Sequence, residues 1–266
     1  LETYPFNRVQ LKGGWFGLKL ADALMVARIP APLTRLISSV ANPIVRQLKR
    51  LKCDMWVFPA QDALSYQIGG PVLATIHDLM HLYEPHFPEV TSSGRPSIRE
   101  HRFSNIAQAA TGILVDSEVG RQHVIESYHT DASKIFPLPY IPPPHSLIDN
   151  VPEDFDSKYN LPSKFIFYPA QYWRHKNHKR LVSALSLLKD ECADIVMIFT
   201  GTNRHGYYKE IVNHVNNLGL KNQVIFLDKH IPDEDLVGFY RHARALMMPT
   251  FFGPTNIPPL EAMAND

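Results

Sequence analysis

The chain has 266 residues, 45% of them hydrophobic and 20% charged, and its formal net charge at neutral pH is +1. This composition excludes a disordered chain, and the length predicts two domains or one large one. So small a net charge gives no global field that would attract nucleic acid, and no nucleic-acid partner is expected. Cys53 and Cys192 are the only cysteines and lie far apart, so neither a disulfide framework nor a thiolate metal site is indicated.

The hydrophobic runs and the first residues bear on location. No stretch approaches the ~20 apolar residues of a membrane span. The start at Leu1 lacks the basic and then apolar pattern of a secretory signal. We therefore expect a cytoplasmic protein. Because the first residue is not Met, we also expect the natural chain to be longer.

The first half of the chain predicts a doubly wound α/β domain, in which short apolar runs bounded by turn residues alternate with helices. Helices are expected at 15–28, 33–51, 98–110 and 118–128, and strands at 55–58, 72–77, 112–116 and 135–138. Prolines then crowd the segment from Tyr140 to Asp154, which predicts a linker between domains 1–145 and 146–266.

The same alternation restarts beyond this linker. Strands are expected at 165–169, 194–201, 223–227 and 245–249, and helices at 177–189, 206–218 and 233–243. Two Rossmann-like domains of this kind would face each other across a cleft. Because such sheets bind ligands beyond the carboxyl ends of their strands, the residues that follow each strand are the candidates for a site.

The first candidate is the segment YPAQYWRHKNH at residues 168–178, a strand end followed by a cationic loop and a helix start. Asn177 can cap that helix, and the free amides of its first turn, with Arg174 and Lys176 beside them, suit a diphosphate. A solvent-exposed basic loop with ordinary capping explains the same residues as well. The other histidines here, His175 and His178, are interpreted as surface or cap residues.

The second candidate is the segment at residues 249–263, again a strand end, an irregular loop and a helix start. Free amides in the loop can meet a phosphate, and Glu261 can accept hydrogen bonds from ribose hydroxyls. On chemistry alone, the simpler interpretation that Glu261 only offsets the helix dipole is the stronger one.

The third candidate is His77, at the end of an apolar strand, where an imidazole can donate to sugar hydroxyls or to a developing charge. His77 and His81 have a helical metal-ligand spacing, but no His-Glu-x-x-His motif or third ligand accompanies them. No metal site is therefore expected. Dinucleotide, Walker, nucleophile-elbow and kinase motifs are all absent from the sequence.

Taken in order, these segments resemble the retaining glycosyltransferases of family 4, which have the GT-B fold. Residues 165–178 look like the opening of the family's donor domain, and NIPPLEA at 256–262 is similar to its loop and helix. HDL at 77–79 and VDSE at 115–118 resemble segments of its first domain. The likeness runs from about Met55 to the end and points to a bacterial polysaccharide-type subgroup with a GPTNIPPLEA loop. Family members continue past both ends, so the GT-B fold is expected to be truncated here.

This resemblance implies a hexosyltransferase-type enzyme of polysaccharide or glycan biosynthesis. It would move a sugar from a UDP-, GDP- or ADP-sugar to a hydroxyl of a glycan or lipid-linked acceptor with retained configuration. No metal or other cofactor would be required. Peripheral association with the cytoplasmic face of a membrane would fit such an acceptor.

The resemblance also assigns roles to residues. The catalytic residues would be His77 and Lys176. The diphosphate would be bound by Gln171, Arg174, Lys176, Asn177, Asn256 and Ile257. The base and ribose would be bound by Leu227, Asp228, Lys229 and Glu261. The sugar and acceptor cleft would hold His77, Asp78, Ser117, Glu118 and Thr255.

One departure leaves alternatives open. Eight positions before Glu261 the family has a second glutamate, but here Gly253 stands instead, which we interpret as a subgroup difference. A nucleotide-sugar-binding protein without turnover is the first alternative. A sugar-nucleotide epimerase is the weaker one, because it would need acid and base residues on both cleft walls and only His77 is clearly placed.

Overall fold

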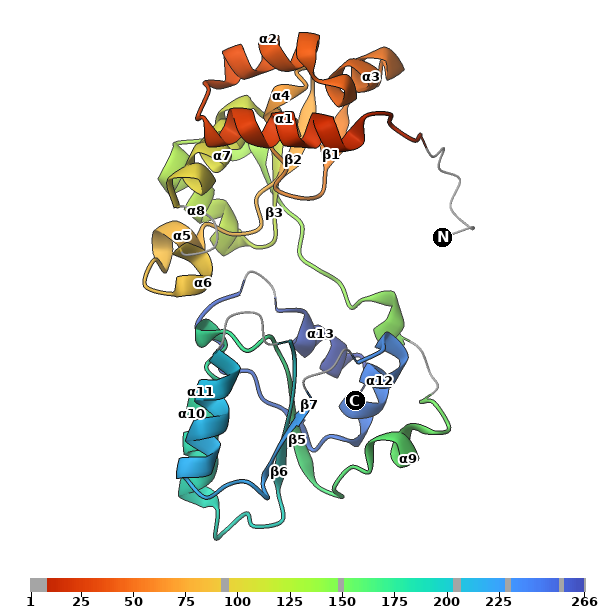
Figure 1. Cartoon of the computed structure of the whole chain (residues 1–266), viewed down its shortest axis with the longest axis vertical. Coiled ribbons are helices and arrows are strands. Elements are labelled where there is room, and N and C mark those ends of the chain that lie inside the picture. Colours follow the sequence, from red (N-terminus) through yellow and green to blue (C-terminus); the bar gives the residue numbers. More distant parts are fainter. Residues whose placement is uncertain are drawn as a thin grey trace. The chain divides into compact units, whose positions relative to one another are not determined.

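The computed structural model describes residues 9–91, 96–147, 151–202, 207–227, 231–253 and 256–265. Internal contacts divide the chain into two compact units (Figure 1). Unit 1 comprises the residues up to Pro85 together with Val90–Pro139, and unit 2 comprises His86–Glu89 and the residues from Tyr140 onward. The division into domains 1–145 and 146–266 stays a prediction.

Unit 1 contains a parallel sheet in the order β1-β2-β3-β4. Its strands are β1 Trp56–Phe58, β2 Val72–Thr75, β3 Gly112–Val115 and β4 Ile135–Pro137. Its helices are α1 Gly14–Val26, α2 Ala31–Ala41, α3 Pro43–Leu51, α4 Leu64–Gln67, α5 Met80–Tyr83, α7 Pro96–Ala109 and α8 Glu118–Tyr128, with a 3₁₀ turn η1 at Ala132–Lys134. The short helix α6, Pro88–Thr91, has its first two residues in unit 2 and its last two in unit 1. The central strands β2 and β3 pair with Ala74 beside Ile113, and both of these side chains are fully buried.

The helix expected at 33–51 is wrong in one respect, because the structure breaks it into α2 and α3 at Asn42. Pro43 has no backbone N–H and excludes helical geometry at the residue before it. The Asn42 side chain then begins the new helix, since its Oδ1 accepts hydrogen bonds from the amides of Ile44 at 2.9 Å and Val45 at 3.4 Å. Asn42 is fully buried, so this cap lies inside unit 1.

Unit 2 contains a second parallel sheet, in the order β7-β6-β5-β8. Its strands are β5 Phe165–Pro169, β6 Val196–Thr200, β7 Val224–Leu227 and β8 Ala245–Leu246. Its helices are α9 Phe155–Tyr159, α10 His178–Leu188, α11 Tyr207–Asn217, α12 Asp233–His242 and α13 Ile257–Met263, with 3₁₀ turns η2 at Pro144–Leu147 and η3 at Arg174–Lys176. The strand expected at 245–249 is shorter than predicted.

Helices cover both faces of this second sheet, with α10 and α11 on one side and α9 and α12 on the other (Figure 1). Side chains alternate between faces along a strand, so neighbouring residues of β5 enter different cores. Tyr168 packs in the cluster that includes Leu181 and Ile211, whereas Phe167 packs with Phe239. The chain runs outward from β5 through β6 to β7 and then returns to the other side of β5 at β8. The crevice between β5 and β8 is therefore the place where such a sheet binds a ligand.

Candidate functional site

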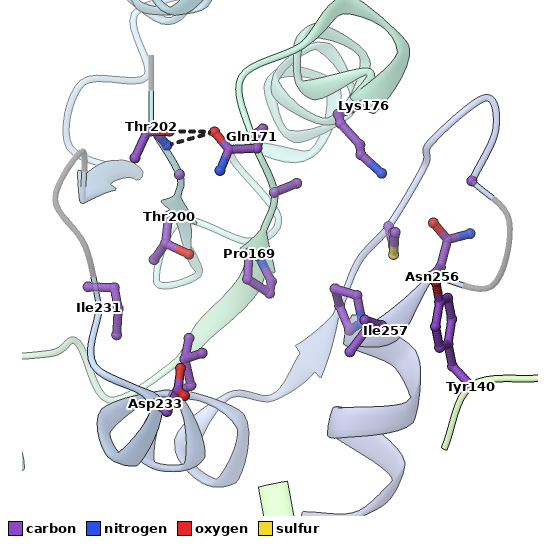
Figure 2. Close-up of a pocket in the computed structure, with 16 residues that line it drawn as sticks. Tyr140, Pro169, Gln171, Lys176, Thr200, Thr202, Ile231, Asp233, Asn256 and Ile257 are labelled. Atoms are coloured by element: carbon purple, nitrogen blue, oxygen red, sulfur yellow. Dashed lines mark hydrogen bonds between the residues drawn. The ribbon is translucent and has the colours of Figure 1, made fainter. Parts of the chain in front are cut away.

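A pocket of about 490 Å³ opens in unit 2 at the carboxyl ends of its strands (Figure 2). Its wall is formed by residues 169–171 at the end of β5, residues 200–202 at the end of β6, Met248 after β8, and residues 256–258 at the start of α13. Tyr140 and Asp233 also line it. The pocket thus lies at the point where the strand order reverses, as the topology predicts.

Lys176 supplies positive charge to this pocket. It ends the turn η3, where its carbonyl accepts a hydrogen bond of 2.8 Å from the hydroxyl of the buried Tyr168. Burial lowers the pKa of Lys176, and within the described ranges no carboxylate pairs with its ammonium group. A desolvated cation of this kind is stabilised by an incoming anion. The prediction that Lys176 lies at the site agrees with this position, and its role stays a prediction.

Gln171 lies beside Lys176 in the pocket wall, held by Thr202. Its Oε1 accepts hydrogen bonds from the Thr202 hydroxyl at 2.6 Å and the Thr202 amide at 3.2 Å (Figure 2). This leaves the NH₂ group of Gln171 as a donor for a ligand. The strand ends approach so closely that a Cβ on Gly201 would lie 2.3 Å from the carbonyl oxygen of Ala170, so only glycine fits there.

The predicted loop before α13 brings Asn256 and Ile257 to the pocket. Asn256 adopts a left-handed conformation with φ 47°, and its side chain does not cap the helix. A Cβ on Gly253 would lie 2.2 Å from Asn256 Oδ1. The missing side chain at residue 253 therefore gives the Asn256 amide its space.

Glu261 lies just behind the pocket wall and is not among the described lining residues. Its side chain is 8% exposed. Oε2 accepts a hydrogen bond of 2.6 Å from the Tyr240 hydroxyl, and Oε1 lies 2.9 Å from Nε2 of His145. Burial and the Glu261 charge together raise the pKa of Tyr240, so this hydroxyl remains a donor.

Several residues assigned to the site lie elsewhere in unit 2. Arg174 is exposed, pairs with Glu210 and sits 4.9 Å above the ring of Tyr207. Asn177 precedes α10 in a left-handed conformation, and its side chain does not cap that helix as expected, because Nδ2 donates to the carbonyl of Pro249 at 3.1 Å. Leu227 ends β7 away from the described pocket wall. Asp228, Lys229 and Thr255 lie outside the described residues.

His175 and His178 are not the surface residues that the sequence suggested. His175 is 4% exposed and His178 fully buried. Burial lowers the pKa of each imidazole to about 3, and the Lys176 charge contributes further in both cases. Both side chains are therefore neutral, and they leave Lys176 as the cation of this loop that reaches the pocket.

In unit 1, His77 follows β2 and meets Asp116, which follows β3. Its Nδ1 lies 3.0 Å from Asp116 Oδ1, and this hydrogen bond is the main cause that raises the pKa of His77. Asp116 is buried, at 4% exposure. Sequence analysis missed Asp116, although a carboxylate directly after an apolar strand was the signal that could have found it.

The other residues predicted for this region, Asp78, Ser117 and Glu118, make hydrogen bonds or ion pairs with residues close to them in the sequence. Asp78 Oδ1 accepts a hydrogen bond from the amide of Met80 at 3.0 Å. Ser117 caps α8 by accepting from the amide of Gly120 at 3.1 Å, and Glu118 pairs with Arg121 on the same helix at 2.8 Å. The hydrogen bond between His77 and Asp116 thus joins these two residues, whereas Ser117 caps α8 and Glu118 pairs along it.

The described residues contain neither a cluster of metal ligands nor a membrane-spanning helix. Across the described ranges, no group of three or more His, Cys, Asp or Glu side chains is arranged to hold a metal ion. Likewise, no helix in that part of the chain has the length and apolar character needed to cross a membrane. The expectation of a metal-independent reaction stays a prediction.

Comparison with known proteins identifies the fold. Residues 151–266 match the family model of glycosyl transferases group 1. A crystal structure of HepE from Anabaena, in complex with UDP and glucose, superposes with a TM-score of 0.66 at 18% identity, over 86% of this chain and 62% of HepE. Sucrose-phosphate synthase from Thermosynechococcus elongatus does so with a TM-score of 0.64, over 86% of this chain and 59% of that protein. The predicted α/β fold of GT-B type is thereby confirmed.

The chain is also similar in sequence to a mannosyltransferase. The serotype-specific mannosyltransferase WbdA of Escherichia coli is 26% identical over 177 residues, which are 64% of this chain and 22% of that protein. The chain thus spans about a fifth of this relative and less than two thirds of HepE. The predicted relationship to glycosyltransferases is confirmed at the level of the fold and of the family model that residues 151–266 match.

Proposed function

We propose that this chain comes from a glycosyltransferase that takes a sugar from a nucleotide-sugar donor and transfers it to a hydroxyl of a glycan or lipid-linked acceptor. The observation that carries the proposal is Lys176, a half-buried cation with no carboxylate partner among the described residues, in a pocket at the switch point of a parallel sheet. The family match, the mannosyltransferase relative and the UDP complex of HepE support it.

Within this activity we assign retaining transfer of the family 4 type, in polysaccharide or glycan biosynthesis. The support is the ordered set of segments that resemble this family, from HDL at 77–79 to NIPPLEA at 256–262. Gly253 in place of a glutamate fits a subgroup in which an amide, that of Asn256, occupies the same space. We place the reaction in the cytoplasm, at the membrane face where a lipid-linked acceptor would be met.

The pocket has the chemistry to assist departure of a nucleoside diphosphate. Negative charge builds up on the diphosphate as the bond to the sugar breaks. The Lys176 ammonium and the Gln171 NH₂ group are fixed in a partly desolvated wall, where they stabilise this growing charge more than the ground state. Ile231 and Leu236 provide an apolar surface elsewhere in the pocket wall that suits a base. We assign His77, oriented by Asp116, to a sugar or acceptor hydroxyl.

A binding experiment tests the donor site. UDP, GDP and ADP are compared with their nucleosides by calorimetry and by thermal shift. We expect one diphosphate to bind at least about 10-fold more tightly than its nucleoside, because charge-assisted hydrogen bonds contribute about 1.5–3 kcal/mol. At 100 times its Kd it would stabilise the protein by roughly 2.7 kcal/mol.

The outcomes separate the proposal from its alternatives. If no nucleoside diphosphate binds, the donor site is refuted. If one binds but its sugar conjugate releases no nucleotide in the presence of acceptor glycans, the chain binds nucleotide sugars without turnover. If the free sugar nucleotide changes configuration without transfer, the epimerase alternative holds.

A further inference from the structure

The turn η2, Pro144–Leu147, is fixed against the helices behind the pocket. Its Ser146 is buried, and the Ser146 carbonyl accepts a hydrogen bond of 3.1 Å from Nδ2 of Asn265. The same Nδ2 donates to the carbonyl of Glu261 at 2.9 Å. Prolines at 142–144 further restrict the backbone that enters the turn. The place of His145 in this turn is therefore well defined.

The imidazole of His145 lies between two carboxylates. Nε2 is 2.9 Å from Glu261 Oε1, and Nδ1 is 3.6 Å from Asp233 Oδ2. The other oxygen of Glu261 accepts the Tyr240 hydroxyl at 2.6 Å. The Glu261 carboxylate is thus held at both oxygens, by groups from two different elements, η2 and α12. An oxygen of a carboxylate accepts two hydrogen bonds, so one position on each remains for a ligand.

This cluster connects to the pocket wall in three places. Ile257 and Pro258 line the pocket and precede Glu261 by four and three positions in α13, which puts all three on one side of the helix. Asp233, at the other nitrogen of His145, lines the pocket directly (Figure 2). Tyr140, five residues before His145, contributes its ring to the same wall (Figure 2).

We propose that His145 is a positioning residue for the donor, which orients the Glu261 carboxylate so that its free positions accept the vicinal hydroxyls of the ribose of a nucleoside diphosphate. The inference rests on the proposed function. Without the His145 ring, one oxygen of Glu261 loses its partner and the carboxylate is free to rotate away. A residue that merely fastened η2 to α12 and α13 would affect folding stability but not the recognition of hydroxyl groups.

The test compares UDP, GDP and ADP with their 2′,3′-dideoxy forms by calorimetry, in wild type, His145→Ala and His145→Gln. In wild type we expect the ribose form to bind about 10- to 100-fold more tightly, because the dideoxy form leaves the remaining acceptor position on each oxygen of the buried carboxylate unfilled. In His145→Ala this preference should fall below about 3-fold, through weaker binding of the ribose form alone. His145→Gln retains an amide donor toward Glu261 and should restore most of the preference. His242→Ala, a histidine of α12 outside the described pocket wall, is the matched control.

Three results overturn the inference. Equal weakening of both nucleotide forms by His145→Ala would show a structural role only. A wild-type protein that binds both forms equally would show that no oriented carboxylate reads the ribose, while leaving the proposed donor site intact. A wild-type protein that binds none of UDP, GDP, ADP and their dideoxy forms would refute the inference together with the proposed function.

Discussion

His77, just after β2 in unit 1, and His178, the first residue of α10 in unit 2, have surroundings that move their pKa values in opposite directions. Asp116 accepts a hydrogen bond from His77, which raises the pKa of that imidazole. His178 is enclosed by the rings of Tyr168, Tyr172 and Phe199, with centroids 4.7 to 5.2 Å away, and burial lowers its pKa to about 3.

The opposite pKa shifts show that the two units differ in whether a positively charged group has a carboxylate partner. In unit 1 the buried Asp116 carboxylate pairs with the His77 imidazole, so the charge of a protonated His77 is neutralised inside the unit. In unit 2 His175 and His178 stay neutral, and the positive charge of their loop that reaches the pocket is that of Lys176, which has no carboxylate partner in the described part of the chain. Unit 2 is therefore the one prepared for an anion.

The largest effect is expected from Lys176→Met, which removes that unmatched charge while keeping a long side chain. The Kd of the bound nucleoside diphosphate should rise about 10- to 150-fold, and that of the nucleoside should not change. The midpoint of thermal unfolding should not fall, because a desolvated, unpaired cation does not stabilise the folded state. Calorimetry and thermal unfolding of both proteins measure these quantities.

Lys179→Met is the control for this experiment. Lys179 lies one turn further along, and its Nζ is 3.7 Å from Glu210 Oε2. Its loss removes the same charge from the chain without touching the described pocket wall. If both variants weaken diphosphate binding equally, the effect is one of net charge and Lys176 has no special place.

The next effect concerns the acid stability of unit 2. Below pH 6.5 an unfolded histidine binds a proton, whereas His178 in the folded state does so only near its pKa of about 3. The free energy of unfolding should therefore fall as the pH drops from 6.5 toward 3, by at most about 1.4 kcal/mol per pH unit for this residue. His178→Phe keeps the aromatic packing and should remove this part of the slope.

Urea unfolding between pH 7 and 5, followed by tryptophan fluorescence, measures that slope. His175 has a similar pKa of about 3 and keeps its own contribution in the variant, so the slope should be reduced without vanishing. His242→Phe, at a partly exposed histidine of the same unit, is the matched control for the substitution itself. An unaltered pH dependence in His178→Phe would contradict the buried, neutral state of this imidazole.

The contrast between the two histidines was not visible in the sequence, although much of the fold was. Helix α8 and strand β5 match the predicted ranges residue for residue, because each combines a clear period with a defined end. Helices of four or five residues, such as α4 and α9, leave no period to detect. The apolar stripe predicted one helix at 33–51, but Pro43 divides it into α2 and α3.

The residues of the candidate site that could be predicted are those whose own segment contains the signal. Lys176, Gln171 and Asn256 stand directly after strands or at a helix start, and the structure places all three at the pocket. Asp233 and Tyr140 were missed, because each comes from a segment, the start of α12 and the stretch before η2, in which the sequence carries no signal for a ligand. The burial of His178 was missed, because the segment around it is polar and the rings that cover it, such as Phe199 of β6, come from elsewhere in the chain.

A smaller effect is expected from Asp116→Asn in unit 1. The hydrogen bond that raises the pKa of His77 is weakened while burial continues to lower it, so the pKa of His77 should fall. In wild type the raised pKa stabilises the folded state fully below pH 6.5, and this contribution disappears as the pH rises through the folded pKa. The loss should be about 1 kcal/mol at low pH.

Proton NMR titration of the His77 ring and unfolding at two pH values check this. Asp78→Asn is the matched control, since Asp78 acts on His77 only through its charge, a weaker cause. Its effect on the His77 pKa should be smaller than that of Asp116→Asn. Equal shifts in the two variants would show that general charge, and not the hydrogen bond, sets this pKa.

The smallest effect is expected from Arg174→Ala, two residues from Lys176. The sequence assigned both cations to the diphosphate, but the Arg174 guanidinium is exposed and already paired with Glu210. Exposed ion pairs contribute about 0–1 kcal/mol, so the Kd of the diphosphate should change less than about fivefold. A loss as large as that of Lys176→Met would mean that the loop turns Arg174 inward when the donor binds. The ratio of the two losses therefore measures how far the unliganded pocket already has its binding geometry.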